Sequence, residues 1–351
     1  MDNINERLEY LENKVLNQEH LIAELKKELS KKNEQINSFP QLSATSLGKA
    51  TSDGKIIYRN WWAGPELEGF CDDIWFTQFL RYHFPDADYK FNIFSVFGNH
   101  DNIMCPMDGK KIFYSGECIN VVYPHIKENF GNHALKYVDF ALGHDLLDCK
   151  KYLRFPFWFL WVFPPVITEE DIENTIDGWM SLEIEKSQNV CNVSSHDNWS
   201  TRALIADSIS DFTEISYGGL WRNNTNDLWD KFNNNKLEFL KNFKFNICAE
   251  NLVYDAYVTE KVFDSIRSDC IPLYVGGGNY LEPKVLNQNA MLIWDFNKDN
   301  SDTIETFKNL VSDEKSYAEF KEQNILLETS SKYIIKKFSD LKKHFENLIY
   351  D

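Results

Sequence analysis

The stretch Phe245–Gly278, FNICAENLVYDAYVTEKVFDSIRSDCIPLYVGGG, carries the strongest prediction about the fold. It begins with an apolar run of strand length, passes through a polar loop, continues as a helical segment and returns to an apolar run that ends in three glycines. A strand–loop–helix–strand unit of this kind is typical of α/β proteins with parallel sheets. Its loop residues would lie at the carboxyl end of a strand, where open α/β sheets bind their ligands.

The start of the predicted helix in this stretch suits an anionic ligand. Thr259 is a good helix N-cap, and Glu260 and Lys261 follow it in the first turn. Backbone N–H groups at a helix N-terminus carry partial positive charge, which favours a phosphate. A lysine in the first turn is disfavoured by the helix dipole by about 0.3–1 kcal/mol, so Lys261 makes most sense if an anion lies in front of it. The alternative is an ordinary capped helix with a solvated lysine.

Apolar runs and helical segments alternate on both sides of this unit. Helices are expected at 72–83, 199–212 and 227–243 and over most of 301–351. Strands are expected at 55–62, 90–98, 110–116, 136–143, 189–195, 213–219 and 290–296. The apolar stretch 155–165 is too short for a spanning helix, which needs about 20 residues, so it is expected to be a buried strand or an inter-domain segment. Two α/β sheets of comparable size with a cleft between them form the simplest architecture.

The N-terminal residues differ from the rest of the chain. Apolar side chains recur with a 4-3-4-3 spacing from Ile4 to Ile36, which predicts a coiled-coil helix over residues 1–38. We therefore expect a homodimer or trimer formed through residues 4–36. A single amphipathic helix lying on the globular part is the alternative. Residues 39–54 are rich in Ser, Thr, Gly and Pro and are expected to be a linker.

The composition excludes several classes of partner. The 351 residues include 37 Lys+Arg and 54 Asp+Glu, which gives a net charge of −17. This acidity argues against a nucleic-acid partner, because a phosphate backbone needs a basic face. A small anionic ligand needs only two or three well-placed cations and is not excluded.

Cysteine usage and the chain ends predict a location. The seven cysteines contain no CxxC pair, so neither a disulfide framework nor a zinc site is expected. Without a signal peptide or transmembrane helix, we expect a cytoplasmic protein. Residues 331–351 form a basic amphipathic pattern. A helix of this kind either makes peripheral contact with the inner face of the membrane or packs back across the two domains.

The segment Ala249–Gly276 closely resembles the signature of the bacterial and animal α-1,3/4-fucosyltransferase family. The shared elements are the Glu-Asn pair, the Tyr-Val-Thr-Glu-Lys run and the Ile-Pro-Leu-Tyr-Val-Gly strand. The likeness covers most of residues 56–300. It extends to RNWWAG (59–64), KIFYSGE (111–117), DFALGHD (139–145) and STRALIADSISDF (200–212).

The resemblance implies the GT-B architecture, in which two Rossmann-like domains face each other. It places an N-terminal acceptor-binding domain at 55–163, a GDP-fucose-binding domain at 164–325 and a C-terminal helix at 326–351. It also implies inverting transfer of L-fucose from GDP-fucose, most often to the 3-OH of GlcNAc in an N-acetyllactosamine-type glycan acceptor.

The resemblance further implies roles for individual residues. Glu117 would be the general base, and Arg202 and Lys261 would neutralise the diphosphate. The remaining donor-site candidates are Asn251, Tyr257 and Glu260, followed by Glu250, Arg222 and Thr259. From position alone, Glu117 would be an exposed loop acid and Arg202 a surface arginine. The family usually has Glu-Asn where this chain has Glu117-Cys118, a departure that would alter acceptor choice or rate if the asparagine orients the base.

These roles agree with the chemistry of an inverting transfer. A base contributes about 10²–10⁴ in rate, and stabilising a departing diphosphate is an electrostatic task for Arg, Lys and a helix N-terminus. No DxD motif stands at a predicted strand end, so no metal or other cofactor is expected to be obligatory. Two alternatives remain open, namely a GT-B transferase that uses another nucleotide sugar and a non-catalytic coiled-coil oligomeric adaptor.

Overall fold

The first sheet is built from short apolar strands that occur in space in the same order as in the sequence. Strand β1 runs antiparallel to β2, and the strands from β2 to β6 are all parallel. The six strands are β1 (Gly48–Ala50), β2 (Ile56–Arg59), β3 (Phe91–Phe94), β4 (Lys110–Tyr114), β5 (Phe140–Gly143) and β6 (Tyr152–Arg154). Sequential parallel strands need crossover connections, which places the intervening segments against the sheet faces.

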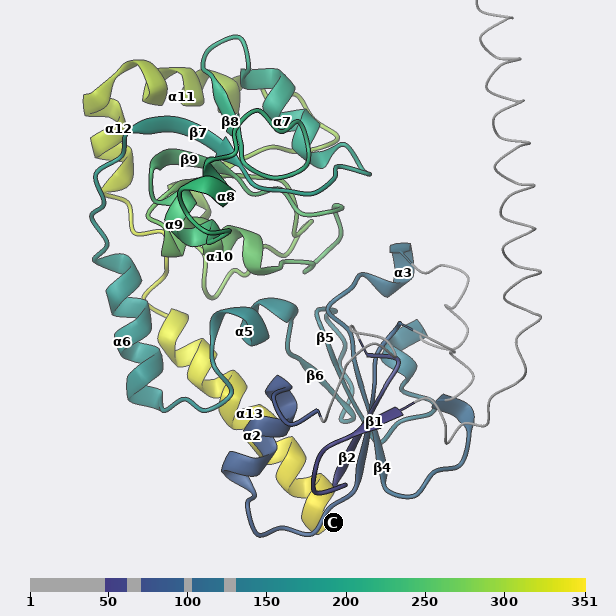
Figure 1. Cartoon of the computed structure of the whole chain (residues 1–351). Helices are drawn as coiled ribbons and strands as arrows, with labels where there is room; N and C mark the ends of the chain where they lie inside the picture. The colour runs from purple at the N-terminus through teal and green to yellow at the C-terminus, as the bar shows by residue number, and fades with distance from the viewer. Residues whose placement is uncertain (1–47, 62–70, 98–102, 123–130) are drawn as a thin grey trace, which may run out of the picture. The chain divides into compact units, whose positions relative to one another are not determined.

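The computed structural model describes residues 48–61, 71–97, 103–122 and 131–351 (Figure 1). The predicted coiled coil at 1–38, and the oligomer expected from it, lie outside the described residues. Residues 48–50 form β1 and pair with β2, so the sheet begins inside the segment expected to be a linker up to residue 54. A strand of three residues is too short to show the apolar periodicity that would distinguish it from a linker.

Alternating side chains divide the core of the first sheet between its two faces. Ile93 and Ile112 point to the face covered by α2 (Trp75–His83) and α13 (Ser330–Tyr350), whereas Phe94 and Phe113 point to the other. The second face is covered by the segments between β3 and β5, including α3 (Ile119–Val122) and the 3₁₀ turn η5 (Gly131–Ala134). Figure 1 shows α2 and α13 side by side against the sheet, where the rings of Phe79 and Phe345 are in contact.

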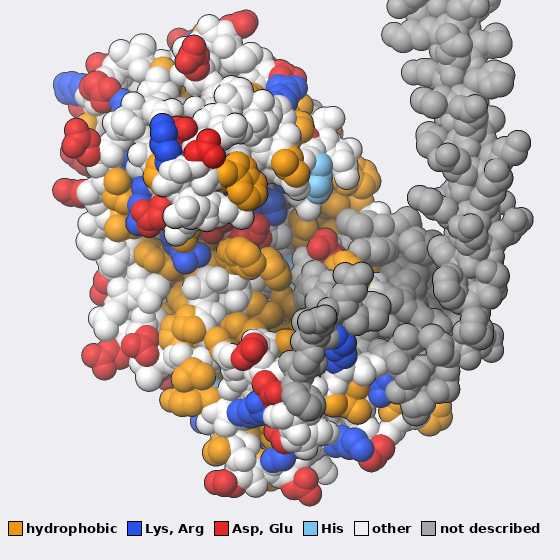
Figure 2. Space-filling view, viewed as in Figure 1, with side chains coloured by type: hydrophobic (Ala, Val, Ile, Leu, Met, Phe, Trp, Pro, Cys, Tyr) orange, Lys and Arg blue, Asp and Glu red, His pale blue; other side chains and the backbone are white. Residues whose placement is uncertain are grey.

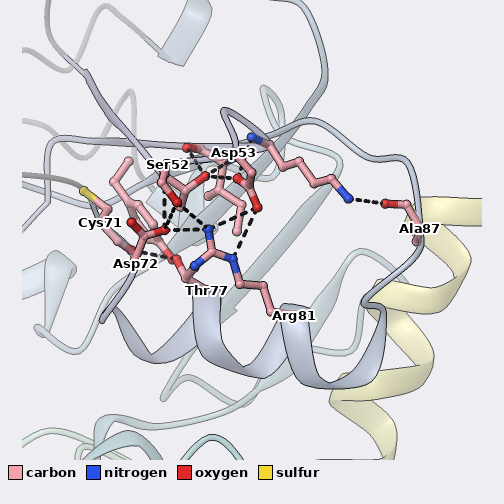
Figure 3. A network of polar contacts seen from close by, with 11 residues as sticks. Ser52, Asp53, Cys71, Asp72, Thr77, Arg81 and Ala87 are labelled. Atoms are coloured by element: carbon pink, nitrogen blue, oxygen red, sulfur yellow. Dashed lines mark hydrogen bonds and ion pairs between the residues drawn. The ribbon is translucent and has the colours of Figure 1, made fainter.

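A polar network fastens the β1–β2 turn to α2 (Figure 3). The guanidinium of Arg81 pairs with Asp53 at 3.1 Å and with Asp72 at 2.5 Å, and the Ser52 hydroxyl donates to Asp72. The ammonium group of Lys55 donates to the backbone oxygen of Ala87 at 2.7 Å. The network holds the turn between β1 and β2 against α2.

The second sheet has five parallel strands in the order β11-β10-β9-β7-β8. The strands are β7 (Gln188–Asn192), β8 (Ile215–Tyr217), β9 (Phe243–Ile247), β10 (Ile271–Tyr274) and β11 (Leu292–Ile293). From β7 the chain first goes outward to β8 and then returns past β7 to β9. The strand order therefore reverses between β7 and β9, which makes that position the topological switch point of a doubly wound sheet.

Helices cover both faces of the second sheet. Ile205 and Ile209 of α7 (Thr201–Ile209) pack with Phe307 of α11 (Ser301–Ser312) on one face. Helices α8 (Asp227–Asp230), α9 (Lys236–Leu240) and α10 (Glu260–Arg267) pack on the other. Asn233 and Asn234 both have positive φ, so the single helix expected over 227–243 is broken into α8 and α9. Helix α12 (Glu314–Lys321) and the 3₁₀ turn η6 (Gln288–Ala290) complete this half.

The apolar stretch 155–165 forms a helix at the junction of the two halves. Helix α5 (Phe157–Val162) contains Trp158, which is fully buried and stacks on Phe263 of α10 with ring centroids 4.3 Å apart. The expectation of a buried strand was wrong, whereas that of an inter-domain segment holds. Trp161 of the same helix is 57% exposed, and hydrophobic side chains gather over α5 on the face in Figure 2.

The C-terminal helix α13 packs back onto the globular part. Ile334, Leu341 and Phe345 are fully buried in the same apolar cluster as residues of β2–β6, α2 and α10. Helix α6 (Glu169–Met180), which starts with a reciprocal Thr168–Asp171 capping box, contributes Ile172 and Ile176 to this cluster. Because its apolar face is already covered, α13 does not offer that face to a membrane, and the alternative of packing across the domains is the observed one. No helix within the described ranges is both long and apolar enough to cross a bilayer.

Candidate active site

A polar pocket of about 260 Å³ lies at the switch point of the second sheet. One wall comes from the segment after β7, including Ser194 and His196, and the other from the end of β9 up to Asn251. Glu260 and Lys261 at the start of α10 close the floor, and Arg202 of α7 and Lys236 of α9 reach in from the sides. The pocket therefore combines three cationic side chains with a helix N-terminus, which suits a multiply charged anion.

Arg202 is held in this pocket by groups from both walls. Its Nη2 atom donates to Asn251 Oδ1 at 2.8 Å, and the Asp197 carboxylate accepts from the backbone N–H groups that begin α7. Arg202 is only 4% exposed, and burial lowers the pKa of its guanidinium. Nη1 has no hydrogen-bond partner among the residues that the structure describes, and its nearest charge is Asp197 at 3.6 Å. An unsatisfied buried donor beside a pocket is expected to bond to what enters it.

Glu250 supports the pocket from behind and does not line it. Its carboxylate is 0% exposed and accepts hydrogen bonds from the Thr259 backbone N–H at 2.7 Å, the Thr259 hydroxyl at 2.6 Å and Lys261 Nζ at 3.2 Å. Thr259 stands at the N-cap of α10, but its hydroxyl is engaged by Glu250 and makes no cap bond to the helix. Neither Glu250 nor Thr259 lines the pocket, and both accept hydrogen bonds from Lys261 Nζ.

Glu260 and Lys236 contribute opposite charges to the lining of the pocket. Burial is the largest influence on Glu260 and raises its pKa, but the charges of Lys261 and Lys236 outweigh it and hold that pKa below its usual value. Lys236 Nζ also pairs with the buried carboxylate of Asp264 on α10 at 2.7 Å. Sequence reasoning missed Lys236, because a lysine after three asparagines has the local pattern of a surface residue.

Glu117 lies on the turn between β4 and α3. The Ser115 hydroxyl accepts from its backbone N–H at 3.0 Å, and Gly116 lets the turn approach the ring of Phe157, which a Cβ there would meet at 2.9 Å. Burial raises the pKa of Glu117. Lys261 lowers it and Glu260 raises it, which places both charges of the pocket floor within electrostatic reach of the Glu117 carboxyl. Glu117 is thus half-buried, and not the fully exposed loop acid that its position alone suggests.

Tyr257 lies at the contact between the two halves. It is buried against Cys118 and Leu252, and its ring meets His144 edge to face with centroids 5.1 Å apart. Tyr257 is absent from the lining of the pocket described above. Cys118, the departure from the family pattern, fills an apolar position beneath this ring.

Arg222 is placed away from the pocket. Its guanidinium pairs with Asp207 of α7 and lies over the ring of Trp221 at 4.6 Å, on the exposed surface. Arg222 is exposed and is absent from the lining of the pocket that contains Arg202. No cluster of three or more His, Cys, Asp or Glu side chains suited to a metal occurs in the described part of the chain.

Comparison with known protein families agrees with this geometry. The model of the glycosyltransferase family 10 (fucosyltransferase) C-terminal region matches residues 184–344, and that of the α-(1,3)-fucosyltransferase FucT N-terminal domain matches residues 65–161. The chain belongs to the fucosyltransferase family. The second of these matches contains Glu117, and the first contains Arg202 and the whole of Phe245–Gly278.

Individual members of the fucosyltransferase family cover different parts of the chain. The α-(1,3)-fucosyltransferase FucT of Helicobacter pylori is 27% identical over 289 residues, which are 73% of this chain and 54% of that protein. A putative fucosyltransferase-like protein of Arabidopsis thaliana is 35% identical over 85 residues, 24% of this chain and 15% of that one. The chain thus spans about half the length of the Helicobacter pylori relative.

Solved fucosyltransferases share the fold. A crystal structure of an α1,3-fucosyltransferase with GDP-fucose aligns with a TM-score of 0.57 and 21% identity, covering 90% of this chain and 94% of that one. Another, with GDP, aligns with a TM-score of 0.51 and 21% identity over 87% and 94% of the two chains. The two α/β halves are therefore arranged as in GT-B fucosyltransferases.

Proposed function

We propose that the chain transfers L-fucose from GDP-fucose to a hydroxyl of a glycan, with inversion at the fucose C1 atom. The observation that carries the proposal is the cationic pocket at the switch point of the second sheet, which contains Arg202 and holds Lys261 within electrostatic reach of Glu117. Open α/β sheets bind nucleotides at this position. Family membership and the ligands of the structural neighbours, GDP-fucose and GDP, support fucose as the transferred group.

The donor end of the reaction is assigned to the pocket. The diphosphate would take the unsatisfied Nη1 donor of Arg202 and the ammonium group of Lys261, while Asn251 keeps Arg202 in position. Glu250 keeps Lys261 charged, because burial lowers the pKa of that lysine but the Glu250 and Glu260 carboxylates outweigh it and raise the pKa. Fixed positive charge stabilises the negative charge that develops on the departing GDP. Glu260 is proposed to accept from hydroxyls of the ribose or fucose.

The acceptor end is assigned to Glu117. In a single displacement the acceptor oxygen forms a bond to fucose C1, the bond from C1 to the phosphate oxygen breaks, and the hydroxyl proton passes to the Glu117 carboxylate. GDP leaves with the electron pair of the broken bond. A carboxyl whose pKa is raised by burial is a better proton acceptor than an ordinary surface glutamate.

The proposed acceptor is O3 of GlcNAc in an N-acetyllactosamine-type glycan. Support comes from the α-1,3 linkage in the names of the Helicobacter pylori relative and of the structural neighbours. We also propose a homodimer or trimer formed through residues 4–36, which sedimentation of the full chain against a variant without residues 1–38 would test.

The test of the proposed function is direct. Purified full-length chain incubated with GDP-fucose and N-acetyllactosamine is expected to release GDP and yield a trisaccharide whose new linkage NMR assigns. A thermal-shift series with GDP-, UDP- and CMP-sugars identifies the nucleotide sugar that the protein binds. A ligand at 100 times its dissociation constant stabilises the folded protein by about 2.7 kcal/mol. Stabilisation by a UDP- or CMP-sugar and not by GDP-fucose would contradict the proposal.

A further inference from the structure

A second cavity, of about 520 Å³, lies at the carboxyl ends of β10 and β11. It is separate from the pocket that contains Arg202, since the two share no lining residue. The loop that follows β9 runs between them, with Asn251 in the first pocket and Tyr254 in the second. A volume in the range of about 300–1,000 Å³ is usual for small-molecule sites.

Exposed apolar side chains form one side of this cavity. Phe296 is 45% exposed and Val253 is 41% exposed, and both line it together with the ring of Tyr254. Large apolar side chains that are exposed side by side in a concavity are a mark of a binding surface. The apolar faces of pyranose rings pack on surfaces of this kind.

Oriented hydrogen-bond acceptors form the other side. Asp255 Oδ1 accepts from the backbone N–H of Asn279 at 2.8 Å, and Asp295 Oδ1 accepts from the backbone N–H of Asn297 at 2.9 Å. Gly278 has φ of +52°, and a Cβ there would lie 2.1 Å from Asp255 Oδ1, so the glycine is needed for this close approach. Each carboxylate has about four lone-pair positions and retains capacity for a further hydroxyl donor.

The charge of the cavity decides against a nucleotide as its ligand. Its described lining contains the carboxylates of Asp255 and Asp295 and neither a lysine nor an arginine. Lys298, next to the lining, pairs with Asp295 at 2.7 Å, so the negative charge that an entering ligand meets is chiefly that of Asp255. An anion would be repelled there, whereas a neutral ligand that offers hydroxyl donors and an apolar face would satisfy both sides. A neutral sugar has both properties.

One wall of the cavity touches the helix that follows Glu117. The hydroxyl of Tyr254 accepts from Asn120 Nδ2 at 3.3 Å, and Asn120 lies on α3, three residues after Glu117. A ligand in the cavity would therefore lie beside α3, which begins two residues after Glu117.

We propose that the cavity lined by Val253, Tyr254, Asp255 and Phe296 is a subsite for a sugar residue of the acceptor glycan. The inference rests on the proposed function and adds that the second half of the molecule, and not only the first, selects the acceptor. Phe296 supplies the apolar platform, and Asp255 accepts from sugar hydroxyls.

The test measures binding and does not depend on turnover. The dissociation constants of N-acetyllactosamine, GDP and GDP-fucose are measured by calorimetry for the full chain and for Phe296→Ala and Asp255→Asn. Each variant is expected to bind N-acetyllactosamine roughly tenfold more weakly, the loss expected of one charge-assisted hydrogen bond or one packing surface. Affinity for GDP reports that the variants are folded. Phe212→Ala, which removes an aromatic ring of similar exposure elsewhere, is the matched control.

The outcomes separate this inference from the proposed function. Unchanged glycan affinity in both variants, or no glycan binding by the unaltered chain, overturns the subsite. Weaker binding of GDP-fucose without weaker binding of GDP also overturns it, because the cavity would then hold the donor fucose. Glycan binding that the variants weaken, in a chain that transfers no fucose, supports the subsite and contradicts the proposed function.

Discussion

Arg154 of β6 and Glu282, which follows β10, form a buried two-pronged ion pair between the two halves of the molecule. Arg154 Nη2 lies 2.6 Å from Glu282 Oε1 and Nη1 lies 3.1 Å from Oε2, although the residues are 128 positions apart. Trp158 Nε1 donates to the same carboxylate at 2.9 Å. Arg154 also donates to the backbone oxygen of Ala256, beside Tyr257, so the pair holds the loop that follows β9 against the first sheet.

Replacing Glu282 by Gln is expected to destabilise the fold by about 3–5 kcal/mol, because it leaves the Arg154 charge buried without its partner. Denaturant unfolding monitored by tryptophan fluorescence measures the change. The double variant Arg154→Met/Glu282→Leu should recover most of the loss, since it removes both charges. The exposed pair of Lys231 and Asp227 is the control, and Lys231→Met should change stability by less than about 0.5 kcal/mol. Equal losses in the single and double variants would contradict this account.

Glu117→Gln is expected to lower kcat by about 10²–10⁴, because an amide side chain cannot take the proton from the hydroxyl of the glycan. The dissociation constant for GDP should stay within about twofold, since Glu117 does not line the pocket that contains Arg202. Initial rates of GDP release and calorimetry measure the two quantities. Glu173→Gln, an exposed acid on α6, controls for the loss of one surface charge. Near-normal turnover of Glu117→Gln would remove Glu117 from the mechanism.

The pH dependence follows from the environment of Glu117. The base acts only when ionised, so kcat/KM should fall below the pKa of Glu117, which burial raises above the value of an ordinary glutamate. His144 lowers that pKa, so His144→Phe, which keeps an aromatic ring against Tyr257, should raise it. The acid limb of the pH profile is therefore expected to move to higher pH in the variant. A limb that stays in place or moves to lower pH would contradict the coupling.

Arg202→Met should weaken GDP binding by roughly 10- to 100-fold, the range for a lost hydrogen bond to a charged group in a pocket. Guanosine, which lacks phosphates, should lose little affinity. Arg222→Met removes a guanidinium from the exposed surface and should leave the dissociation constant for GDP unchanged. Equal losses in the two variants would mean that the pocket at the switch point is not the phosphate site.

Cys118→Asn tests the departure from the family pattern. Cys118 is fully buried against Leu252 and Tyr257, so a polar amide at this position is expected to cost about 1–3 kcal/mol unless it finds a partner. Thermal unfolding measures the cost. Cys149→Asn, at a half-buried position, should cost less. An increase in stability of Cys118→Asn would show that this site already provides a partner for the amide.

Local sequence patterns were sufficient for much of the fold. Strands β3, β4, β5, β7, β8, β9 and β10 and helices α2, α7 and α10 occur where apolar periodicity placed them. The short edge strand β1, the helical state of α5 and the break between α8 and α9 were not foreseen. Each of these segments is short or rich in asparagine, so its local sequence leaves two conformations close in free energy. Packing against the rest of the molecule decides between the two.

Some features of the candidate site were likewise predictable from the sequence, and others were not. The sequence by itself determined the family, the α/β class and the position of Lys261 at a helix start, because these depend on residues that are neighbours in the chain. Only the tertiary structure decided that Glu250 lies behind the pocket at the switch point and that Lys236 lines this pocket. It also decided that Arg222 is exposed and that α13 covers the first sheet. Those outcomes depend on which segments meet across the two halves, and burial and charge pairing at such contacts are set by residues far apart in the sequence.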